Sequence, residues 1–111
     1  MIEKTVKDYL KKTLSVSVLL EKQPDIPKEY ILIEKVGSGE ENHIKNTTIA
    51  IQSFGERLID TAELNERVKK VMKNIIALDE ITKCKLNSDY NYTDSREKTY
   101  RYQAIFDITH Y

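Results

Sequence analysis

A few residues in this chain of 111 amino acids have types that could support chemistry. The single cysteine, Cys84, would be a nucleophile if a histidine, His43 or His110, lay within hydrogen-bond reach as its base. The alternation around Cys84 instead places it on the apolar face of a predicted strand, which favours a buried, unreactive thiol. His43 lies in a predicted loop and His110 beside the carboxyl terminus, so we interpret both as exposed side chains without a catalytic role.

Phosphate binding and acid–base chemistry have only weak signals. Gly37-Ser38-Gly39 has part of the composition of a phosphate loop, but no Gly-Lys-Ser/Thr follows and no helix is predicted to begin there. Adjacent carboxylates, as in Glu40-Glu41, do not converge on one face of a helix or strand, whereas acid–base hydrolysis needs two carboxylates across a cleft. One cysteine and two histidines are too few for a structural zinc site. The sequence therefore predicts no catalytic residue, no metal and no cofactor.

Tyrosine is the outlier of the composition, with seven residues in the chain. Four of them alternate along two predicted strands and are expected to form a ladder at the open end of a hairpin: Tyr90, Tyr92, Tyr100 and Tyr102. Three interpretations stay open, namely a sheet face covered by helices, a protein interface, and a platform that stacks nucleic-acid bases. The third is the least favoured, because nearby carboxylates offset the nearby cations.

Charge and hydropathy exclude several classes of protein. Eighteen Lys and Arg residues balance eighteen Asp and Glu residues, whereas a protein that coats nucleic acid needs clustered cations for counterion release. No apolar run is long enough to span a membrane, and the first residues contain no apolar block of signal-peptide type. We therefore expect a single domain, residues 1–111, made inside the cell and without membrane contact.

Hydrophobic periodicity predicts the elements that position these residues. A helix is predicted over about residues 2–13, because apolar side chains recur there at spacings of three and four. Strands follow over residues 15–20, 30–36 and about 44–53, separated by a proline-containing loop and by a loop at Gly37–Asn42. Capping-box patterns begin at Ser53 and Asp60, and helical spacing then predicts an amphipathic helix over about 56–77.

Two hairpins are predicted from matching strand faces. In the first, Ile31 and Ile33 would lie near Ile51 and Ile49. In the second, which closes the chain, three pairs are expected: Tyr92 with Tyr100, Leu86 with Phe106, and Cys84 with Ile108. The predicted fold is therefore α+β, in the order α-β-β-β-α-β-β. Its mainly antiparallel sheet of about five strands has two helices packed on one face and exposed edges that invite strand addition between subunits.

Several blocks of the chain, in this order, resemble a known family. They are Val16–Glu21, Tyr30–Lys35, the Gly-Ser-Gly-Glu-Glu-Asn-His segment at 37–43, Ile49–Phe54 and Ala62–Val68. Together they resemble the small tail terminator, or tail completion, proteins of tailed phages and prophages of Gram-positive bacteria. The resemblance covers about residues 1–78, and the closing hairpin is compatible with it.

The resemblance implies a structural role in which no reaction is catalysed. Tail terminators form a ring, typically a hexamer, on the head-proximal end of the tail tube. They stop polymerisation of the tube and present a surface to the connector below the head, while DNA passes through the lumen without specific binding. The implied partners are other copies of the chain, the tail tube protein and the head–tail connector protein. The implied location is the tail or neck of the virion, after assembly in the host cytoplasm.

The family has no motif of functional residues, so candidate interface residues are inferred from loop position alone. They are Gly37, Ser38, Gly39, Glu40, Glu41, Asn42 and Lys45 in the first polar loop, and Asp94, Arg96 and Lys98 in the last. Other functions stay open: another neck, head–tail connector or minor capsid protein, a small protein- or nucleic-acid-binding module that uses the tyrosines, and an enzyme that uses Cys84.

Overall fold

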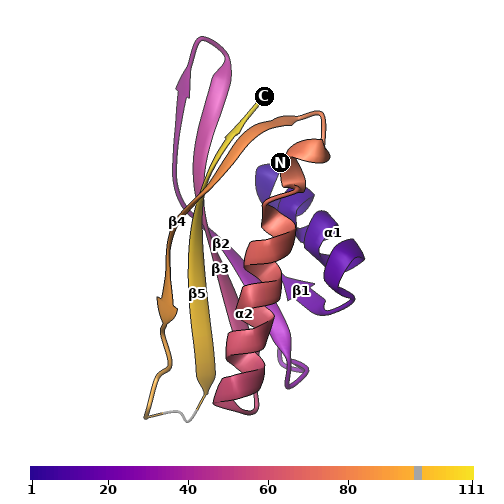
Figure 1. Cartoon of the computed structure of the whole chain (residues 1–111), viewed down its shortest axis with the longest axis vertical. Coiled ribbons are helices and arrows are strands. Elements are labelled where there is room, and N and C mark those ends of the chain that lie inside the picture. The colour runs from indigo at the N-terminus through magenta and orange to yellow at the C-terminus, as the bar shows by residue number, and fades with distance from the viewer. Residues whose placement is uncertain (97–98) are drawn as a thin grey trace.

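A helical layer packs on one face of a five-stranded sheet in the computed structural model, which describes residues 1–96 and 99–111 (Figure 1). The elements are α1 (Ile2–Leu14), β1 (Ser17–Leu19), β2 (Tyr30–Glu41), β3 (Ile44–Gly55), α2 (Leu58–Met72), the short 3-10 helix η1 (Ile75–Ala77), β4 (Ile81–Asn91) and β5 (Tyr100–His110). The α+β class and the order α-β-β-β-α-β-β are thereby confirmed.

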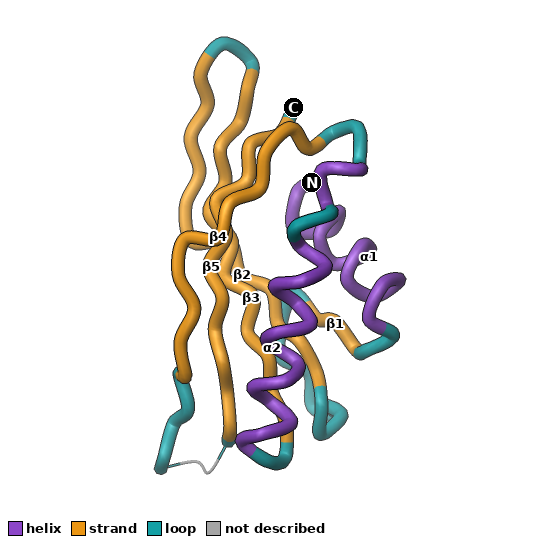
Figure 2. The backbone as a smooth tube through the Cα atoms, viewed as in Figure 1, coloured by secondary structure: helices purple, strands orange, loops and turns teal. Residues whose placement is uncertain are grey.

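The strands lie in the order β1-β2-β3-β5-β4 across the sheet. β1 runs parallel to β2 and pairs only with Tyr30–Leu32, while the other neighbours are antiparallel. Both α-helices lie on the same side of the sheet, as Figure 2 shows, so the opposite face has no helix over it. We call these two sides the helix face and the outer face.

The core lies between the helix face of the sheet and the two helices. One side of α1 is buried at the spacing that the sequence predicted, and the helix face of the sheet contributes alternate residues of β2, β3 and β5. The fully buried members include Val6, Leu10, Ile31, Ile49, Ile51, Val68, Met72, Ile75 and Ala104. The Tyr9 hydroxyl donates a hydrogen bond to the Val71 carbonyl at 2.6 Å and so fixes α1 against α2. Each of these buried side chains larger than alanine contributes roughly 1.5–3 kcal/mol to folding.

The predicted loop at Gly37–Asn42 is wrong. β2 continues to Glu41 and β3 begins at Ile44, so only Asn42 and His43 form the turn. Both turn residues have positive φ, at 52° and 67°, as a two-residue turn between antiparallel strands requires. These strand ends could not be predicted from the sequence, because they are exposed to solvent on both faces. Their residues therefore show no alternation of apolar and polar side chains.

The predicted register of the β2–β3 hairpin is also wrong, by two residues. Ile33 pairs with Ile51, and Ile31 pairs with Ser53. Because side chains alternate with a period of two, this shift leaves the buried faces unchanged. All four isoleucines of the predicted pairing are accordingly buried on the helix face.

The closing hairpin follows its predicted register only over its first half. Cys84 pairs with Ile108 and Leu86 with Phe106, as predicted. A bulge between Leu86 and Ser88 then shifts the register by one residue, so Tyr90 pairs with Gln103 and the predicted Tyr92–Tyr100 pair is wrong. A one-residue shift moves side chains to the other side of a sheet. Tyr90 and Tyr92 therefore lie on the outer face, and the predicted four-tyrosine ladder does not form.

The start of α2 differs from the predicted capping boxes. Its N-cap is Arg57, which makes no side-chain cap hydrogen bond, and Ser53 belongs to β3. Asp60 lies in the first turn and accepts a hydrogen bond from Arg57 Nε at 2.8 Å. Arg57 lowers the pKa of Asp60, first through this hydrogen bond and then through its charge. An acidic side chain in the first turn thus stabilises the helix without capping it.

Gly55, at the end of β3, allows α2 to approach the sheet closely. A Cβ at this position would lie 2.6 Å from Thr61 Oγ1 and 3.4 Å from Thr61 N. Thr61 is fully buried, and its hydroxyl already donates to the Arg57 carbonyl at 2.8 Å. We expect Gly55→Ala to lower the free energy of unfolding by about 1–3 kcal/mol, measured by urea denaturation.

Gly39→Ala is the matched control for this prediction, because a Cβ there meets nothing within 4 Å. Equal stability of Gly55→Ala and the parent would contradict the close approach between β3 and α2.

Candidate interaction surface

The most prominent surface feature is a two-stranded arm, defined here as residues 37–46. It extends past the helical layer at the top of Figure 1, and all of its residues are exposed. The arm contains seven of the predicted interface residues: Gly37, Ser38, Gly39, Glu40, Glu41, Asn42 and Lys45. The structure therefore brings this group together, on extended strands and a tight turn rather than on the predicted loop.

The second predicted group lies at the other end of the sheet, in the connection from β4 to β5 (Figure 1). The backbone N–H of Arg96 donates to Asp94 Oδ1 at 3.0 Å, and Arg96 Nε lies 3.6 Å from the same oxygen. These two residues therefore order their own turn. Lys98, the third member, lies outside the described residues. The two groups form separate surfaces at opposite ends of a molecule that is 44 Å long.

An aromatic and cationic stack on the outer face was not predicted from the sequence. The rings of Tyr30 and Phe54 stack with centroids 4.4 Å apart. The Arg101 guanidinium lies 5.6 Å from the Phe54 centroid and 4.4 Å from the Tyr92 centroid, within the range of cation–π attraction. The only sequence signal was that Tyr30 and Phe54 flank the first hairpin. The bulge in β4 that brings Tyr92 to Arg101 has no signature in the sequence.

Tyr90 is held beside this stack by a hydrogen-bond network. Gln52 Nε2 donates to Gln103 Oε1 at 2.7 Å, and Gln103 Nε2 donates to the Tyr90 hydroxyl at 2.6 Å. Tyr90, Tyr92 and Tyr100 remain exposed by 40%, 47% and 36% respectively, which argues against their burial under the helices. The interface and base-stacking interpretations of these tyrosines stay open.

The structure does not bring Cys84 into contact with a histidine. Among residues 1–96 and 99–111, His43 lies in the turn of the arm and Cys84 packs against the core from β4. His110 is buried rather than exposed as predicted, because its Nε2 lies 2.8 Å from Thr47 Oγ1 and its Nδ1 lies 3.1 Å from the Tyr111 carbonyl. This ring thus joins the base of the arm to the end of β5.

Burial raises the pKa of the Cys84 thiol to about 11, with a smaller contribution from the charge of Asp107. The thiolate is the reactive form, so we expect iodoacetamide at pH 8 to alkylate Cys84 more than about tenfold more slowly in the folded chain than in urea. Equal alkylation rates in the two states would contradict the burial of this thiol.

The Cys84 thiol also ionises more readily in the unfolded chain than in the folded chain. The free energy of unfolding should therefore fall as pH rises from about 9.0 toward 11, and it should fall less steeply in Cys84→Ser.

On the outer face beside Cys84, polar residues form a second network. Asp107 accepts hydrogen bonds from Asn87 Nδ2 at 3.0 Å and from the Thr48 hydroxyl at 2.9 Å. These two bonds, in that order, lower the pKa of Asp107, and the positive charge of Lys85 adds to the effect. Asp107 therefore remains ionised at neutral pH and ties β3, β5 and β4 together just below the arm.

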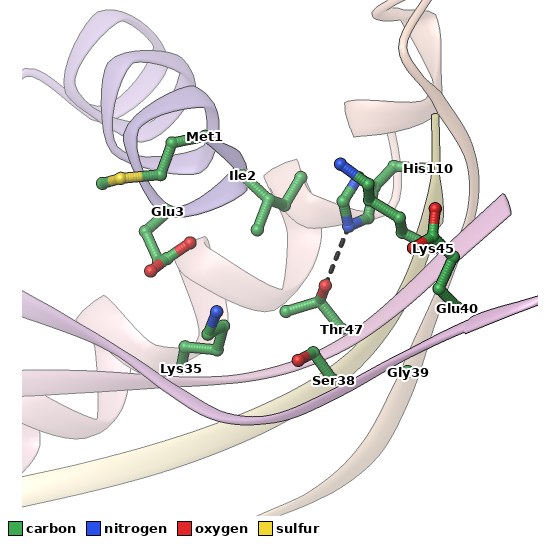
Figure 3. A pocket seen from close by; sticks show the side chains of 10 residues that line it. All are labelled: Met1, Ile2, Glu3, Lys35, Ser38, Gly39, Glu40, Lys45, Thr47 and His110. Atoms are coloured by element: carbon green, nitrogen blue, oxygen red, sulfur yellow. Dashed lines mark hydrogen bonds between the residues drawn. The ribbon is translucent and has the colours of Figure 1, made fainter. Parts of the chain in front are cut away.

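A hollow of about 400 Å³ lies at the base of the arm (Figure 3). Its lining includes Glu3 from α1, Lys35 and Glu40 from β2, Lys45 from β3 and His110 from β5. Carboxylates and ammonium groups are mixed, so the hollow has no dominant charge that would select a charged ligand. In the described part of the chain, no group of three or more His, Cys, Asp or Glu side chains could hold a metal ion.

Comparison with known proteins adds no family to this description. No family model matches the chain. No curated protein matches it either. No helix in the described residues has the length and apolar character needed to cross a bilayer. Function therefore has to be inferred from the arm, the open sheet edges and the outer face.

Proposed function

We propose that this chain is a structural subunit of a tailed-phage particle, similar to the tail terminators that its sequence blocks resemble. In this role, copies form a ring on the head-proximal end of the tail tube, stop polymerisation of the tube and give the head a joining surface. The observation that carries the proposal is a sheet with an open edge on each side and an arm that extends beyond the helical layer.

The two edges are suited to a ring because they differ from one another. On one side, β1 covers only Tyr30–Leu32, so β2 is open from Ile33 to Glu41; on the other side, β4 pairs only with β5 among the described residues. A closed ring of more than two copies uses a different patch on each side of every subunit. This geometry supports a heterologous contact between copies.

A terminator must also bind different partners above and below the ring. The arm and the β4–β5 connection lie at opposite ends of the long axis of the molecule (Figure 1). They therefore offer one surface for the tail tube protein and another for the head–tail connector. Zero net charge is compatible with a lumen through which DNA passes without tight binding.

The chemistry of the described residues favours assembly over catalysis. Burial keeps the Cys84 thiol in its neutral, unreactive form. The charged side chains of the arm make no ion pair within the described part of the chain, so they remain available to a partner. The same open edges and ends would serve another neck protein of the same particle. Position in the virion distinguishes this alternative from a terminator.

Deletion of the gene from the phage or prophage that carries it tests the proposal. We expect electron micrographs to show overlong tails, or tails without heads, and a plasmid copy of the gene to restore normal particles. Tails of normal length joined to heads in the deletion strain would contradict a terminator function.

A further inference from the structure

We propose that copies of this chain join by continuing the sheet, with the edge of β4 in one copy adding to the open edge of β2 in the next. This inference rests on the proposed ring. It adds that the partner is a second copy of the chain, and that β4 and β2 are the strands that meet. Strand addition of this kind supplies main-chain hydrogen bonds to the edges of β2 beyond Leu32 and of β4, which pair with no further strand among the described residues.

The directions of the strands permit this contact. β2 is antiparallel to β3, β3 is antiparallel to β5, and β5 is antiparallel to β4, so β2 and β4 run in opposite directions within one copy. Copies that are related by a rotation about an axis along the strands keep these directions. The β4 edge of one copy therefore meets the β2 edge of the next as an antiparallel pair.

The two edges also lie at the same height. The strand pairings connect β4 to β2 through β5 and β3. They place Lys83 in the same row of the sheet as Gly39, and Lys85 in the same row as Gly37. These rows fall in the regular stretch between the two irregularities of β4, at Ile81/Lys83 and at Leu86/Ser88. Neighbouring copies can thus join with these rows aligned, and the same contact can repeat from copy to copy around a ring.

Charges on the outer face of the two edges are complementary. β2 presents Glu34 and Glu41, while β4 presents Lys83 and Lys85, and all four are exposed. In the described part of the chain none of the four takes part in an ion pair. With the rows aligned, each lysine lies diagonally across from one glutamate, and opposite charges in diagonal positions attract.

Glycines leave room for the lysine side chains. Gly39 would lie directly opposite Lys83, and Gly37 directly opposite Lys85. Neither glycine has a positive φ, and a Cβ at either would meet nothing within 4 Å, so neither is required for the fold of one copy. Their lack of side chains keeps the edge of the arm flat, which suits the addition of another strand.

Disulfide trapping provides a direct test, because the contact would place Ser38 of one copy opposite Cys84 of the next. Both residues point to the helix face, and Cys84 is the only cysteine in the chain. Residues directly opposite in an antiparallel pair are within about 4.5–5.5 Å at Cα, the range that a disulfide needs. Because the Cys84 thiol reacts slowly in the folded chain, purified Ser38→Cys is oxidised with excess diamide until the products no longer change. It should then form a ladder of covalent oligomers on a non-reducing gel that ends at a closed ring.

Two controls make this test specific. Ser95→Cys introduces an exposed cysteine in the β4–β5 connection, outside the two strand segments that are proposed to meet, and Ser38→Cys combined with Cys84→Ser removes one half of the expected bond. Both controls should give dimers at most. A Ser38→Cys chain that gives the same products as the controls, or that stays monomeric at the highest soluble concentration, would overturn the proposed contact.

Charge reversal tests the same contact without cysteine chemistry. One variant carries Lys83→Glu with Lys85→Glu, and the other carries Glu34→Lys with Glu41→Lys. Each alone should self-associate about tenfold or more weakly than the parent, whereas an equimolar mixture should associate as the parent does, because the reversed edges match one another. Equal association of each variant alone and of the parent would contradict the contact.

Failure of this contact and failure of the proposed function give different results. Trapped ladders together with normal tails in the deletion strain would keep the contact and remove the terminator role. Overlong tails in the deletion strain together with no trapped ladder would keep the role and remove the β2–β4 contact.

Discussion

Val68→Asp is expected to leave the chain unfolded in water. Val68 is a fully buried residue of α2 within the core cluster. A carboxylate at this position would be an unpaired charge in an apolar site, and its cost of several kcal/mol is comparable to the whole stability of a typical domain, about 5–15 kcal/mol. Circular dichroism and thermal unfolding would measure the loss directly.

Lys70→Asp is the matched control, because Lys70 lies on the exposed side of the same helix. That variant should unfold cooperatively, with a loss of about 1 kcal/mol, because an acidic side chain replaces a basic one in the last turn of the helix. Ile33→Asp, which places the charge on the sheet side of the core, should be as damaging as Val68→Asp. Cooperative unfolding of either core variant near the parent temperature would show that the helices cover different faces.

Removal of the arm is expected to abolish assembly while the body of the molecule still folds. Ser38 and Thr47 pair directly, so residues 39–46 can be replaced by Asn-Gly, a pair of residues that favours a two-residue turn. All residues removed are exposed, and of them only Lys45 and Asn46 pair with β5, so we expect the free energy of unfolding to fall by about 2 kcal/mol at most. In the deletion strain this variant should yield no more infectious particles than an empty plasmid.

Denaturant unfolding of the shortened chain must accompany the infection assay, because an unfolded variant would fail to assemble for a trivial reason. A folded, armless chain that restores full infectivity would show that the arm has no role in assembly.

The helices and the core could be predicted because their signal is local and strong. On α1, apolar residues at spacings of three and four specify both the element and its buried side. The register of the first hairpin could not be predicted from the same kind of signal. Two registers of β2 against β3 that differ by two residues bury the same isoleucines on the helix face. The turn at Asn42 and His43, together with the register shift between Lys35 and Gly37, decides between them.

The candidate surface was only partly predictable. Polarity alone indicated that Gly37–Asn42 would be exposed, but not that this segment continues as paired strands. No residue type or spacing in the sequence marks the bulge before Ser88. This bulge nevertheless places Tyr90 and Tyr92 on the outer face, near Arg101. The match between the β2 and β4 edges depends on rows that cross three other strand pairings. Such relations appear only when all registers are known.

Immunogold labelling of assembled particles would locate the chain in the virion and so decide the proposed terminator function. The carboxyl-terminal Tyr111 is 67% exposed, so a peptide tag added after it can be labelled with a gold-conjugated antibody in electron micrographs. We predict the label at the junction between head and tail in every complete particle, with one ring of density at that level. Complete particles without label, or with label along the tube or on the capsid shell, would contradict the proposed function.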